Sequence, residues 1–317
     1  MDTEEADLLT GSLRELFADA SADVPRRLRE LGWDDVASAH PAAAATLLFT
    51  EKGRALSAAA LLDEMVLPVL IADLPGGADA VCYPYPGSGS RPSSTAHHTT
   101  GILLRQPEWD ERIVIPIADA DGLTLAVGVV SEFTVTPLPS LDREIGWYAV
   151  AGPTPGPRHD GRAWAVGVAA AHRALAAEII AVAERALELA VEHTSSRRQF
   201  GAPIAAFQAV RHRLADAYVA IAAARALLDA AFADGSGVAA IAAKGRAGRA
   251  HQLVSASAVQ VCGAMGATLE HPLHRYVNRG AVLDALLGSS AELTAELGSL
   301  IRAAVRSGRE IPLLVEV

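Results

Sequence analysis

A regular apolar stripe in the C-terminal half of the chain constrains its fold more than any other feature. Between residues 204 and 232 large apolar side chains recur every three or four positions, which is the period of one helix face. The stripe consists of Ile204, Phe207, Val210, Leu214, Tyr218, Ile221, Leu228 and Phe232. Residues 164–189 carry a similar stripe, so the sequence predicts long helices that pack through these faces.

Capping signals indicate two further helices in this half. Ser236 follows a break in the apolar pattern and can cap a helix over residues 238–261. Ser289 and Glu292 have the spacing of a capping box before a last helix that ends near residue 305. Four long antiparallel helices fit a bundle, and we interpret every stripe as ordinary core packing.

The connection from residue 194 to 208 joins the first two of these helices. Arg197 and Arg198 place positive charge at the turn. Gly201 tolerates backbone dihedrals that other residues resist, and Pro203 suits the start of a helix because its missing N–H is not needed there. The pattern predicts a tight connection that presents its side chains rather than burying them.

The remaining sequence divides into two parts of different composition. Residues 5–75 keep a helical spacing of leucines with charges between them. Glycine, proline and β-branched residues increase from about Pro75, and residues 113–115, 123–130 and 133–137 resemble short strands. We therefore predict an α+β, mainly α, protein with three domains, at residues 1–75, 76–157 and 158–317.

Charge and composition limit the class of protein. The formal net charge of −10 argues against a nucleic-acid binder, which needs a basic face. The only two lysines, Lys52 and Lys244, suggest arginine-rich genome composition rather than chemistry. The two cysteines lie far apart, with no Cys/His set at metal-ligand spacing, so no disulfide framework and no metal site are indicated.

The N-terminal part contains no targeting or membrane signal that we can recognise. The first residues are acidic where a signal peptide would be basic. The most apolar early run, residues 58–74, is interrupted by charges and proline and is too short to cross a bilayer. We expect a cytoplasmic protein without a membrane partner.

The segment Arg197-Arg-Gln-Phe-Gly, followed by Pro203 and the pair Phe207-Gln208, resembles the signature of the acyl-CoA dehydrogenase family. In that family the arginine grips the diphosphate of a flavin adenine dinucleotide (FAD) that is bound mainly by a neighbouring subunit. A planar guanidinium suits such bidentate recognition. By this resemblance Arg197 binds the diphosphate, Phe200 lies near the adenine side, and Gln208 adds an amide contact.

A second segment, Gln260-Val-Cys-Gly-Ala-Met-Gly, is similar to the family's Gln-x-x-Gly-Gly-x-Gly. Glycines at a helix end let backbone amides approach a dinucleotide closely. Gln260 and Gly263 match as cofactor-binding positions, whereas Ala264 replaces the second glycine with a residue that carries a methyl group. We interpret the following histidines, His271 and His274, as interfacial or solvated rather than catalytic.

Weaker matches extend the resemblance toward the N-terminus. Leu31-Gly-Trp and the segment at residues 51–56 are similar to the family's N-terminal helical domain, and residues 135–142 to the end of its middle β-domain. Pro86 to Ser90 is at best a remnant of the family's flavin-side loop, and we interpret residues 86–93 as a flexible surface loop. The strand whose tryptophan packs on the flavin ring is not visible. The resemblance implies an acyl-CoA dehydrogenase-like fold with a reduced β-domain and a C-terminal four-helix bundle.

The family's reaction needs a carboxylate that removes a weakly acidic proton next to a thioester carbonyl. Most members place this glutamate before the last helix, where Leu287 stands in this chain. Other members place it on the helix before the arginine turn, where Ala171 stands beside His172. Both positions lack a carboxylate, so no catalytic residue is assigned. Three glutamates on the same helix, Glu178, Glu188 and Glu192, fit a solvated face.

This combination resembles the small, degenerate subunits of bacterial α2β2 acyl-CoA dehydrogenases that degrade cholesterol and related steroid side chains. The resemblance implies FAD at an interface with a full-length homologue, which supplies the base, a bulky acyl-CoA substrate, and electron-transfer flavoprotein as the electron acceptor. Two alternatives stay open. The chain is a self-sufficient homo-oligomeric dehydrogenase with a relocated base such as Glu178, or a non-catalytic scaffold of a complete dehydrogenase.

Overall fold

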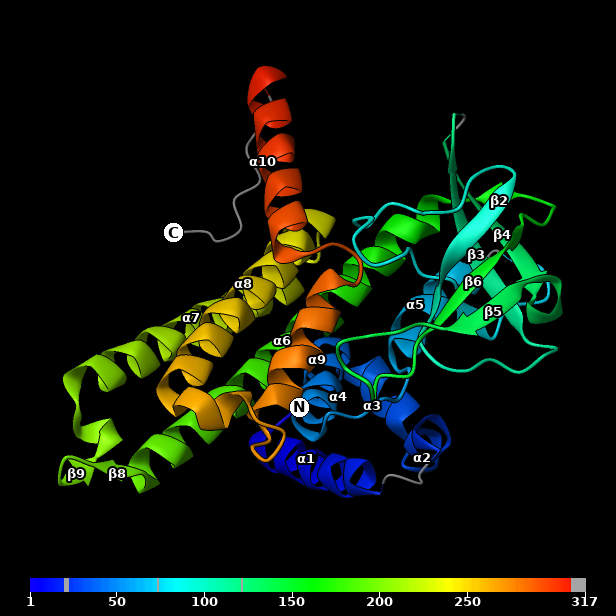
Figure 1. The fold of residues 1–317 in the computed structure, drawn as a ribbon. Coiled ribbons are helices and arrows are strands. Elements are labelled where there is room, and N and C mark those ends of the chain that lie inside the picture. Colours follow the sequence, from blue (N-terminus) through cyan, green and yellow to red (C-terminus); the bar gives the residue numbers. More distant parts are fainter. Residues whose placement is uncertain (20–22, 73, 121, 309–317) are drawn as a thin grey trace.

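The computed structural model describes residues 1–19, 23–72, 74–120 and 122–308 (Figure 1). Its N-terminal part contains five helices: α1 (Thr3–Ala18), α2 (Val24–Glu30), α3 (Trp33–Ala39), α4 (Pro41–Ala55) and α5 (Leu62–Ile71). The side chains of Asp2 and Asp23 cap α1 and α2 by accepting hydrogen bonds from backbone N–H groups of the first helical turn. Pro41 starts α4, where no hydrogen bond from a backbone N–H is needed. Buried leucines of α1, α4 and α5 belong to the main hydrophobic core.

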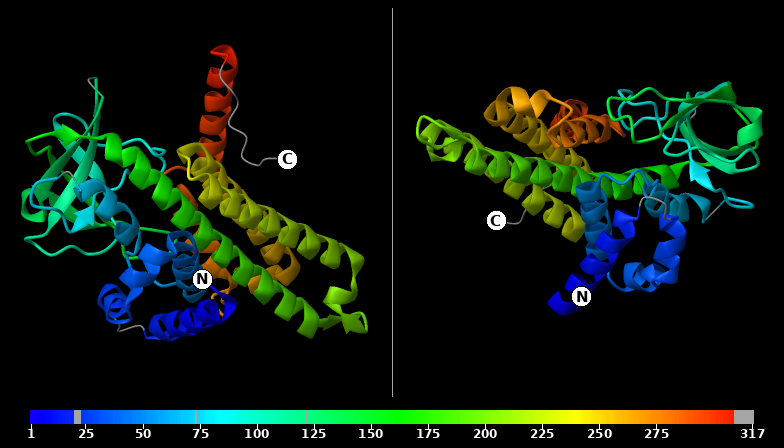
Figure 2. Two further views of the ribbon diagram at one scale, coloured as in Figure 1. Left: turned by 180° about the vertical axis from the view of Figure 1, so that it is seen from behind. Right: turned by 60° about the horizontal axis from the view of Figure 1, so that its bottom comes forward.

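A small β unit follows the N-terminal helices. One sheet has the order β1-β3-β4-β7 and the other the order β2-β6-β5. The strands are β1 (Ala80–Val81), β2 (His98–Leu103), β3 (Arg112–Asp119), β4 (Gly122–Val129), β5 (Thr134–Pro137), β6 (Tyr148–Pro153) and β7 (His159–Asp160). A separate apolar cluster that includes Ile113, Ile115 and Val150 fills the space between the sheets, which curve around it (Figure 2). The three strands expected from the sequence are confirmed as β3, β4 and β5.

The C-terminal half consists of long helices. They are α6 (Arg162–Ser196), α7 (Gln208–Asp234), α8 (Gly237–Cys262), α9 (Leu273–Ala285) and α10 (Ser290–Arg306). A two-residue hairpin, β8 (Arg198–Gln199) and β9 (Ala202–Pro203), joins α6 to α7. The predicted caps are confirmed, because Ser236 Oγ accepts from Ala239 N–H and Ser289 forms a capping box with Glu292.

The packing of this half differs in part from the sequence interpretation. Helix α9, which the sequence did not predict, lies against α6 and α8, while α10 contacts α8 and then projects beyond the bundle (Figure 1). The stripe on α7 is also not core packing throughout. Ile221 and Leu228 are buried, but 66% of Tyr218 and 39% of Phe207 are exposed.

Helix α6 forms the axis of the molecule. It is long and apolar enough to cross a membrane, but 72% of its most apolar window is buried inside the protein. It contacts α4, α5, α7, α8 and α9 along its length (Figure 2). Its N-terminal end lies beside the β unit, and its C-terminal end carries the β8–β9 hairpin. One candidate site therefore lies near each end of α6.

Candidate functional site

The β8–β9 hairpin presents the first group of predicted cofactor-binding residues. Arg197 is the C-cap of α6, and its side chain is exposed. Phe200 is 93% exposed and adopts a positive φ of 52°, which turns the chain at the hairpin tip. Its ring meets Phe207 edge to face, with 6.2 Å between the ring centroids. Gln208 is exposed in the first turn of α7. The prediction that this connection presents its side chains is confirmed.

The second predicted group lies where α8 ends. Gly263 has φ 61° and ψ −145°, a conformation that favours glycine, and a side chain added there would meet no atom within 4 Å. Gln260 and Ala264 are exposed on either side of it. The chain then turns back so that the ring of His271 lies 5.7 Å from the ring of His193 on α6. The fold thus brings the two motifs, about 60 residues apart, to one end of the bundle.

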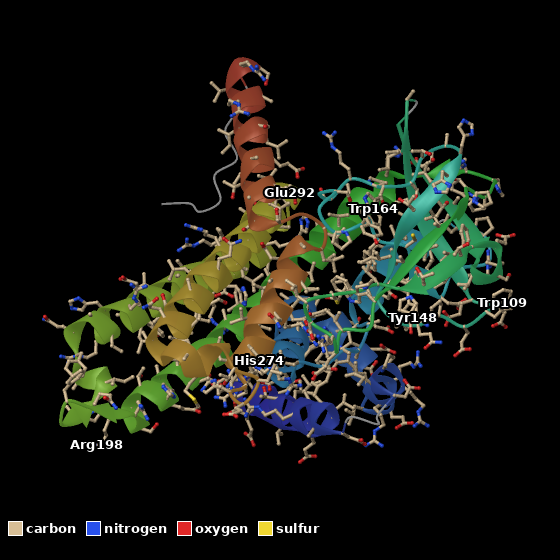
Figure 3. The ribbon with its side chains drawn as sticks, in the orientation of Figure 1. Trp109, Tyr148, Trp164, Arg198, His274 and Glu292 are labelled. Atoms are coloured by element: carbon tan, nitrogen blue, oxygen red, sulfur yellow. The ribbon has the colours of Figure 1, made fainter. Side chains whose placement is uncertain are left out.

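This end of the bundle suits the dinucleotide part of FAD. The Arg197 guanidinium has no hydrogen-bond or ion-pair partner among the described residues, so it is available to an external anion. A side chain at Gly263 would meet no atom within 4 Å, and Ala264 is exposed. The methyl group that Ala264 carries in place of the family's second glycine is therefore at the surface. Figure 3 shows Arg198 at this end and Trp109 of the β unit at the other.

The two positions that carry the family's base lie together at the other site, although 115 residues separate His172 from Leu287. Ala171 is fully buried, and Leu287 is 1% exposed. His172, next to Ala171, contacts the Leu287 carbonyl through Nε2 at 2.9 Å. Neither position offers a carboxylate, and Leu287 has a φ of 57°, which is unusual for a leucine. The contact of His172 with Leu287 therefore brings the first base position next to the second, which the sequence did not show.

Buried polar groups hold this turn closed. Lys244 Nζ donates to the carbonyl of Asp284 at 3.0 Å and to that of Gly288 at 2.5 Å. Burial lowers the pKa of Lys244 to about 8 and that of His172 to about 3, so the imidazole is neutral near pH 7. Lys244 is thus a structural ammonium, and its presence is not explained by composition alone.

The remnant of the flavin-side loop lies against the same turn. A side chain added at Gly288 would be 3.7 Å from the backbone of Gly89. Both ends of the loop are tied, since Tyr85 N–H donates to Ser93 Oγ at 3.2 Å and Ser93 Oγ donates to the Thr100 carbonyl at 2.8 Å. Residues 86–93, predicted as a flexible surface loop, are all partly or fully exposed, which agrees with a surface position. Gly89 therefore lies close to Gly288, the residue that follows the base position Leu287.

Glu178 corrects the sequence interpretation. It is not part of a solvated face but is 1% exposed, and its Oε1 accepts from Lys52 Nζ at 2.5 Å. Burial lowers the pKa of Lys52, although the Glu178 carboxylate opposes this effect. A second buried pair, Arg279 and Asp142, lies close enough to influence Lys52 electrostatically. The carboxylate of Glu178 is therefore committed to an ion pair and is not a free base.

The other two glutamates also have partners. Glu188 Oε2 binds Arg54 and Arg185, each at 2.9 Å, and Glu192 Oε1 binds Arg185 at 2.8 Å. Both are partly or fully exposed, which agrees with a surface position. The space beside Lys52 and Glu178 is a small cavity of about 20 Å³, roughly large enough for one water molecule. None of the three glutamates is placed at the Ala171–Leu287 turn as a proton acceptor.

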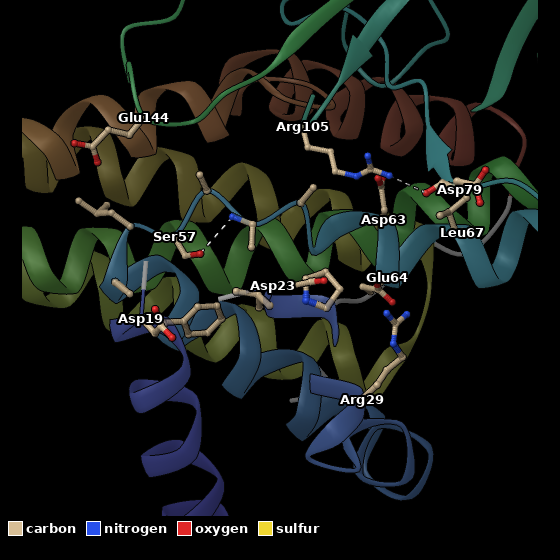
Figure 4. Close-up of a pocket in the computed structure, with 18 of the residues that line it drawn as sticks. Asp19, Asp23, Arg29, Ser57, Asp63, Glu64, Leu67, Asp79, Arg105 and Glu144 are labelled. Carbon is tan, nitrogen blue, oxygen red and sulfur yellow. Dashed lines mark hydrogen bonds between the residues drawn. The ribbon is translucent and has the colours of Figure 1, made fainter. Parts of the chain in front are cut away.

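A larger cavity of about 770 Å³ escaped the sequence reasoning. It lies between α1, α2, the loop before α5 and the edge of the β unit (Figure 4). Asp63 lines it, accepts from Tyr83 Oη at 2.8 Å, and has its pKa raised to about 7 by burial. Arg105 in its wall is held by Glu111 at 2.8 Å. The only sequence signal was a carboxylate, Asp63, inside an apolar run.

Comparison with known proteins agrees with this geometry. Residues 159–297 match the family model described as acyl-CoA dehydrogenase, C-terminal domain. This segment belongs to the acyl-CoA dehydrogenase family. It includes both cofactor motifs and both base positions. Members of this family depend on FAD, so the cofactor expected from the sequence has family support, whereas its place between subunits is still a prediction.

Relatives of the chain include two proteins called acyl-CoA dehydrogenase IpdE2. The one from Mycobacterium tuberculosis is 43% identical over 125 residues, which is 39% of each chain. The one from Mycolicibacterium smegmatis is 41% identical over 118 residues, which is 37% of this chain and 38% of the relative. The matches therefore span about two fifths of the length of these relatives.

Solved structures resemble nearly the whole chain. A Tcur3481-Tcur3483 steroid ACAD G363A variant aligns with a TM-score of 0.79 at 23% identity and covers 96% of this chain and 99% of its own. The ChsE4-ChsE5 complex from Mycobacterium tuberculosis aligns with a TM-score of 0.72 at 20% identity and covers 95% and 98%. At these identities the likeness establishes the fold, and the predicted acyl-CoA dehydrogenase-like architecture is confirmed.

Proposed function

We propose that this chain is a subunit of an FAD-dependent acyl-CoA dehydrogenase that introduces an α,β double bond into a bulky, steroid-type CoA thioester. A full-length homologue in the same α2β2 assembly supplies the glutamate base. This chain contributes cofactor contacts across the interface. The complex is expected in the cytoplasm, with electron-transfer flavoprotein as its electron acceptor.

One observation carries the proposal. The two places from which the family's base acts, Ala171 and Leu287, lie together, are buried, and contain no carboxylate. A methyl and an isobutyl group cannot accept the α-proton. The alternative base, Glu178, is held in an ion pair with Lys52. Chemistry on a thioester therefore has to draw its base from another chain.

The names of similar proteins support the substrate class and the assembly. The steroid ACAD and the ChsE4-ChsE5 complex each pair two different polypeptides in their descriptions, and each shares the fold of this chain. The exposed Tyr218 and Phe207 on α7 are consistent with a surface that another subunit covers. These features favour a hetero-oligomer over a monomer.

The residues of this chain would hold the cofactor rather than react with substrate. FAD supplies the two-electron acceptor for the oxidation. Arg197 would bind its diphosphate, Phe200 would lie along the adenine side, and Gln208 with Gln260 would donate amide hydrogens. The open backbone at Gly263 would admit the dinucleotide. The turn at Leu287, closed by His172 and Lys244, would keep water and substrate out of the degenerate half.

The test is co-expression with a full-length homologue that retains the base. The chain alone should purify with little visible flavin absorbance and should oxidise no acyl-CoA. The complex should be yellow and should oxidise a steroid CoA thioester. If the isolated chain is yellow and active, a self-sufficient homo-oligomer replaces this proposal.

An arginine variant separates a cofactor role from a scaffold role. Arg197→Ala in the complex should weaken FAD binding about 10- to 100-fold, because a charge-assisted hydrogen bond contributes about 1.5–3 kcal/mol. Arg198→Ala, one residue away, is the matched control, since Arg198 already donates to the Gly201 carbonyl at 3.1 Å. Unchanged FAD content and turnover in Arg197→Ala would instead identify the chain as a non-catalytic scaffold.

A further inference from the structure

Three potentially cationic side chains gather at the C-terminal end of α6. His193 and Arg197 are separated by one helical turn, and the Arg197 N–H donates to the His193 carbonyl at 2.9 Å. His271, from the segment between α8 and α9, places its ring 5.7 Å from that of His193. Both histidines are partly exposed, and Arg197 is exposed. These three side chains, His193, Arg197 and His271, are called the cationic cluster.

The cationic cluster has no anion of its own. Among the residues that the structure describes, no carboxylate forms an ion pair with any of its three members. Glu192, next to His193, is bound to Arg185 at 2.8 Å. The pKa of His193 is lowered, first by partial burial and then by the positive charges of His271 and Arg197. Like charges close together without a counter-ion repel one another, and a bound anion would replace this repulsion by attraction.

We propose that His193 and His271 complete, with Arg197, a binding site for the diphosphate of the cofactor, and that His193 takes up a proton as the diphosphate binds. This inference rests on the proposed function and adds two residues to it. The His193 imidazolium donates to a diphosphate oxygen, and the guanidinium binds the same group. His271 donates through Nε2–H, because its Nδ1 accepts from the Leu273 N–H at 3.2 Å. Affinity for the cofactor then depends on pH in the range where histidine titrates.

Two ligands of this enzyme class carry a diphosphate, FAD and the CoA part of the substrate. The position of the cationic cluster favours FAD. It lies at the end of α6 that carries Phe200 and Gly263, whereas the Ala171–Leu287 turn lies where α6 approaches the β unit (Figure 1). Titrations with FAD and with CoA, each alone, distinguish the two sources.

Several charged groups surround His193 and have to be considered in a pH experiment. They come from α6 itself, from the segment between α8 and α9, and from the first turn of α9. The groups are Glu192, Arg197, Glu270, His271, His274 and Arg275. Arg275 is bound to Glu144, and His274 Nδ1 donates to the His271 carbonyl at 2.7 Å. Among the described residues, His271 Nε2 and the ring nitrogens of His193 have no hydrogen-bond partner, so these atoms are available to a new anion.

The experiment measures FAD affinity of the apo-complex by quenching of flavin fluorescence between pH 5.5 and 8.5. Wild-type affinity should fall about tenfold from pH 6 to pH 8, which is about 1.4 kcal/mol. The double variant His193→Gln/His271→Gln should bind more weakly at pH 6 and should show a flat profile. His97→Gln, an exposed histidine of the β unit, is the matched control and should reproduce the wild-type profile.

A charge-restoring variant guards against a merely structural effect. His193→Arg carries a permanent cation, so it should bind FAD at pH 8 at least as tightly as wild type does at pH 6. A double variant with wild-type affinity and pH profile would overturn the inference while leaving the proposed function intact. So would a pH-dependent response to CoA with none to FAD. If the wild-type complex binds no FAD at any pH, the proposed function itself fails.

Discussion

Replacing Glu178 by leucine should destabilise the chain strongly, because the substitution leaves an ammonium group buried. The side chain of Glu178 is 1% exposed and that of Lys52 is 9% exposed, with 2.5 Å between the charged atoms. At an effective dielectric constant of about 20 the attraction at this distance is roughly 7 kcal/mol, and desolvation of both ions opposes most of it. Removing one partner loses the attraction but keeps the desolvation of the other.

We therefore expect Glu178→Leu to lower the free energy of unfolding by about 3–5 kcal/mol. The double variant Lys52→Met/Glu178→Leu should lie within about 1 kcal/mol of wild type or exceed it, because two apolar side chains fill the same space without buried charge. Urea unfolding of the purified chain, followed by circular dichroism, measures both. The structure predicts the difference in the free energy of unfolding between the single and the double variant.

The same residue tests the relocated base. Glu178→Gln in the complex should reduce stability but leave turnover per bound FAD unchanged. The reasoning fails if Glu178→Leu costs less than about 1 kcal/mol, since the pair would then not be buried as described. It also fails if Glu178→Gln abolishes turnover while unfolding is unaffected, since that result is the signature of a catalytic carboxylate.

Three further predictions concern buried groups. Lys244 has a pKa of about 8 in the folded chain and 10.5 in the unfolded chain, so the unfolded chain binds more protons between these two pH values. The free energy of unfolding should therefore rise by up to about 3 kcal/mol from pH 8 to 10.5, relative to Lys244→Met. Urea unfolding at each pH measures this difference. The pKa of Asp63 is raised to about 7 in the folded chain, so the folded chain binds more protons than the unfolded chain between about pH 4 and 7. The free energy of unfolding should therefore fall by up to about 4 kcal/mol as the pH rises through this range. Asp63→Asn should remove this fall in the same assay. A side chain at Gly280 would overlap His251, so Gly280→Ala should lower the melting temperature. Gly11 has open space around it, so Gly11→Ala should leave the melting temperature unchanged or raise it by a few degrees. Equal effects of the two substitutions would contradict the packing of α9 on α8.

Local signals in the sequence predicted much of the helical architecture. The apolar period of residues 204–232 and the caps at Ser236 and Ser289 depend only on neighbours in the chain, and the structure contains the expected helices. Helix α9 was not predicted, because it follows a glycine-containing turn and no capping side chain marks its start. The exposure of Tyr218 on a core-like stripe could not be predicted either, since apolar period does not say which chain covers the face.

The candidate site was predicted in part. The sequence identified Arg197, Phe200 and Gly263 from motif text, and the fold places them at one end of the bundle. Glu178 was misjudged, because a charge every few residues on a helix suggests solvent, and nothing near Glu178 in sequence reveals the lysine that faces it. The pairing of His193 with His271 was equally invisible. Each of these contacts joins residues that are far apart along the chain.

The amino-acid sequence by itself determined most of the long helices and the caps at Ser236 and Ser289, because these depend on side-chain chemistry within a few residues. It also shows that Leu287 and Ala171 occupy the base positions. Only the tertiary structure decided that those positions meet, that Lys52 neutralises a glutamate 126 residues away, and that two distant motifs share one end of α6. The physical reason is that such contacts arise from the path of the whole chain. Their energies depend on burial, which no local pattern specifies.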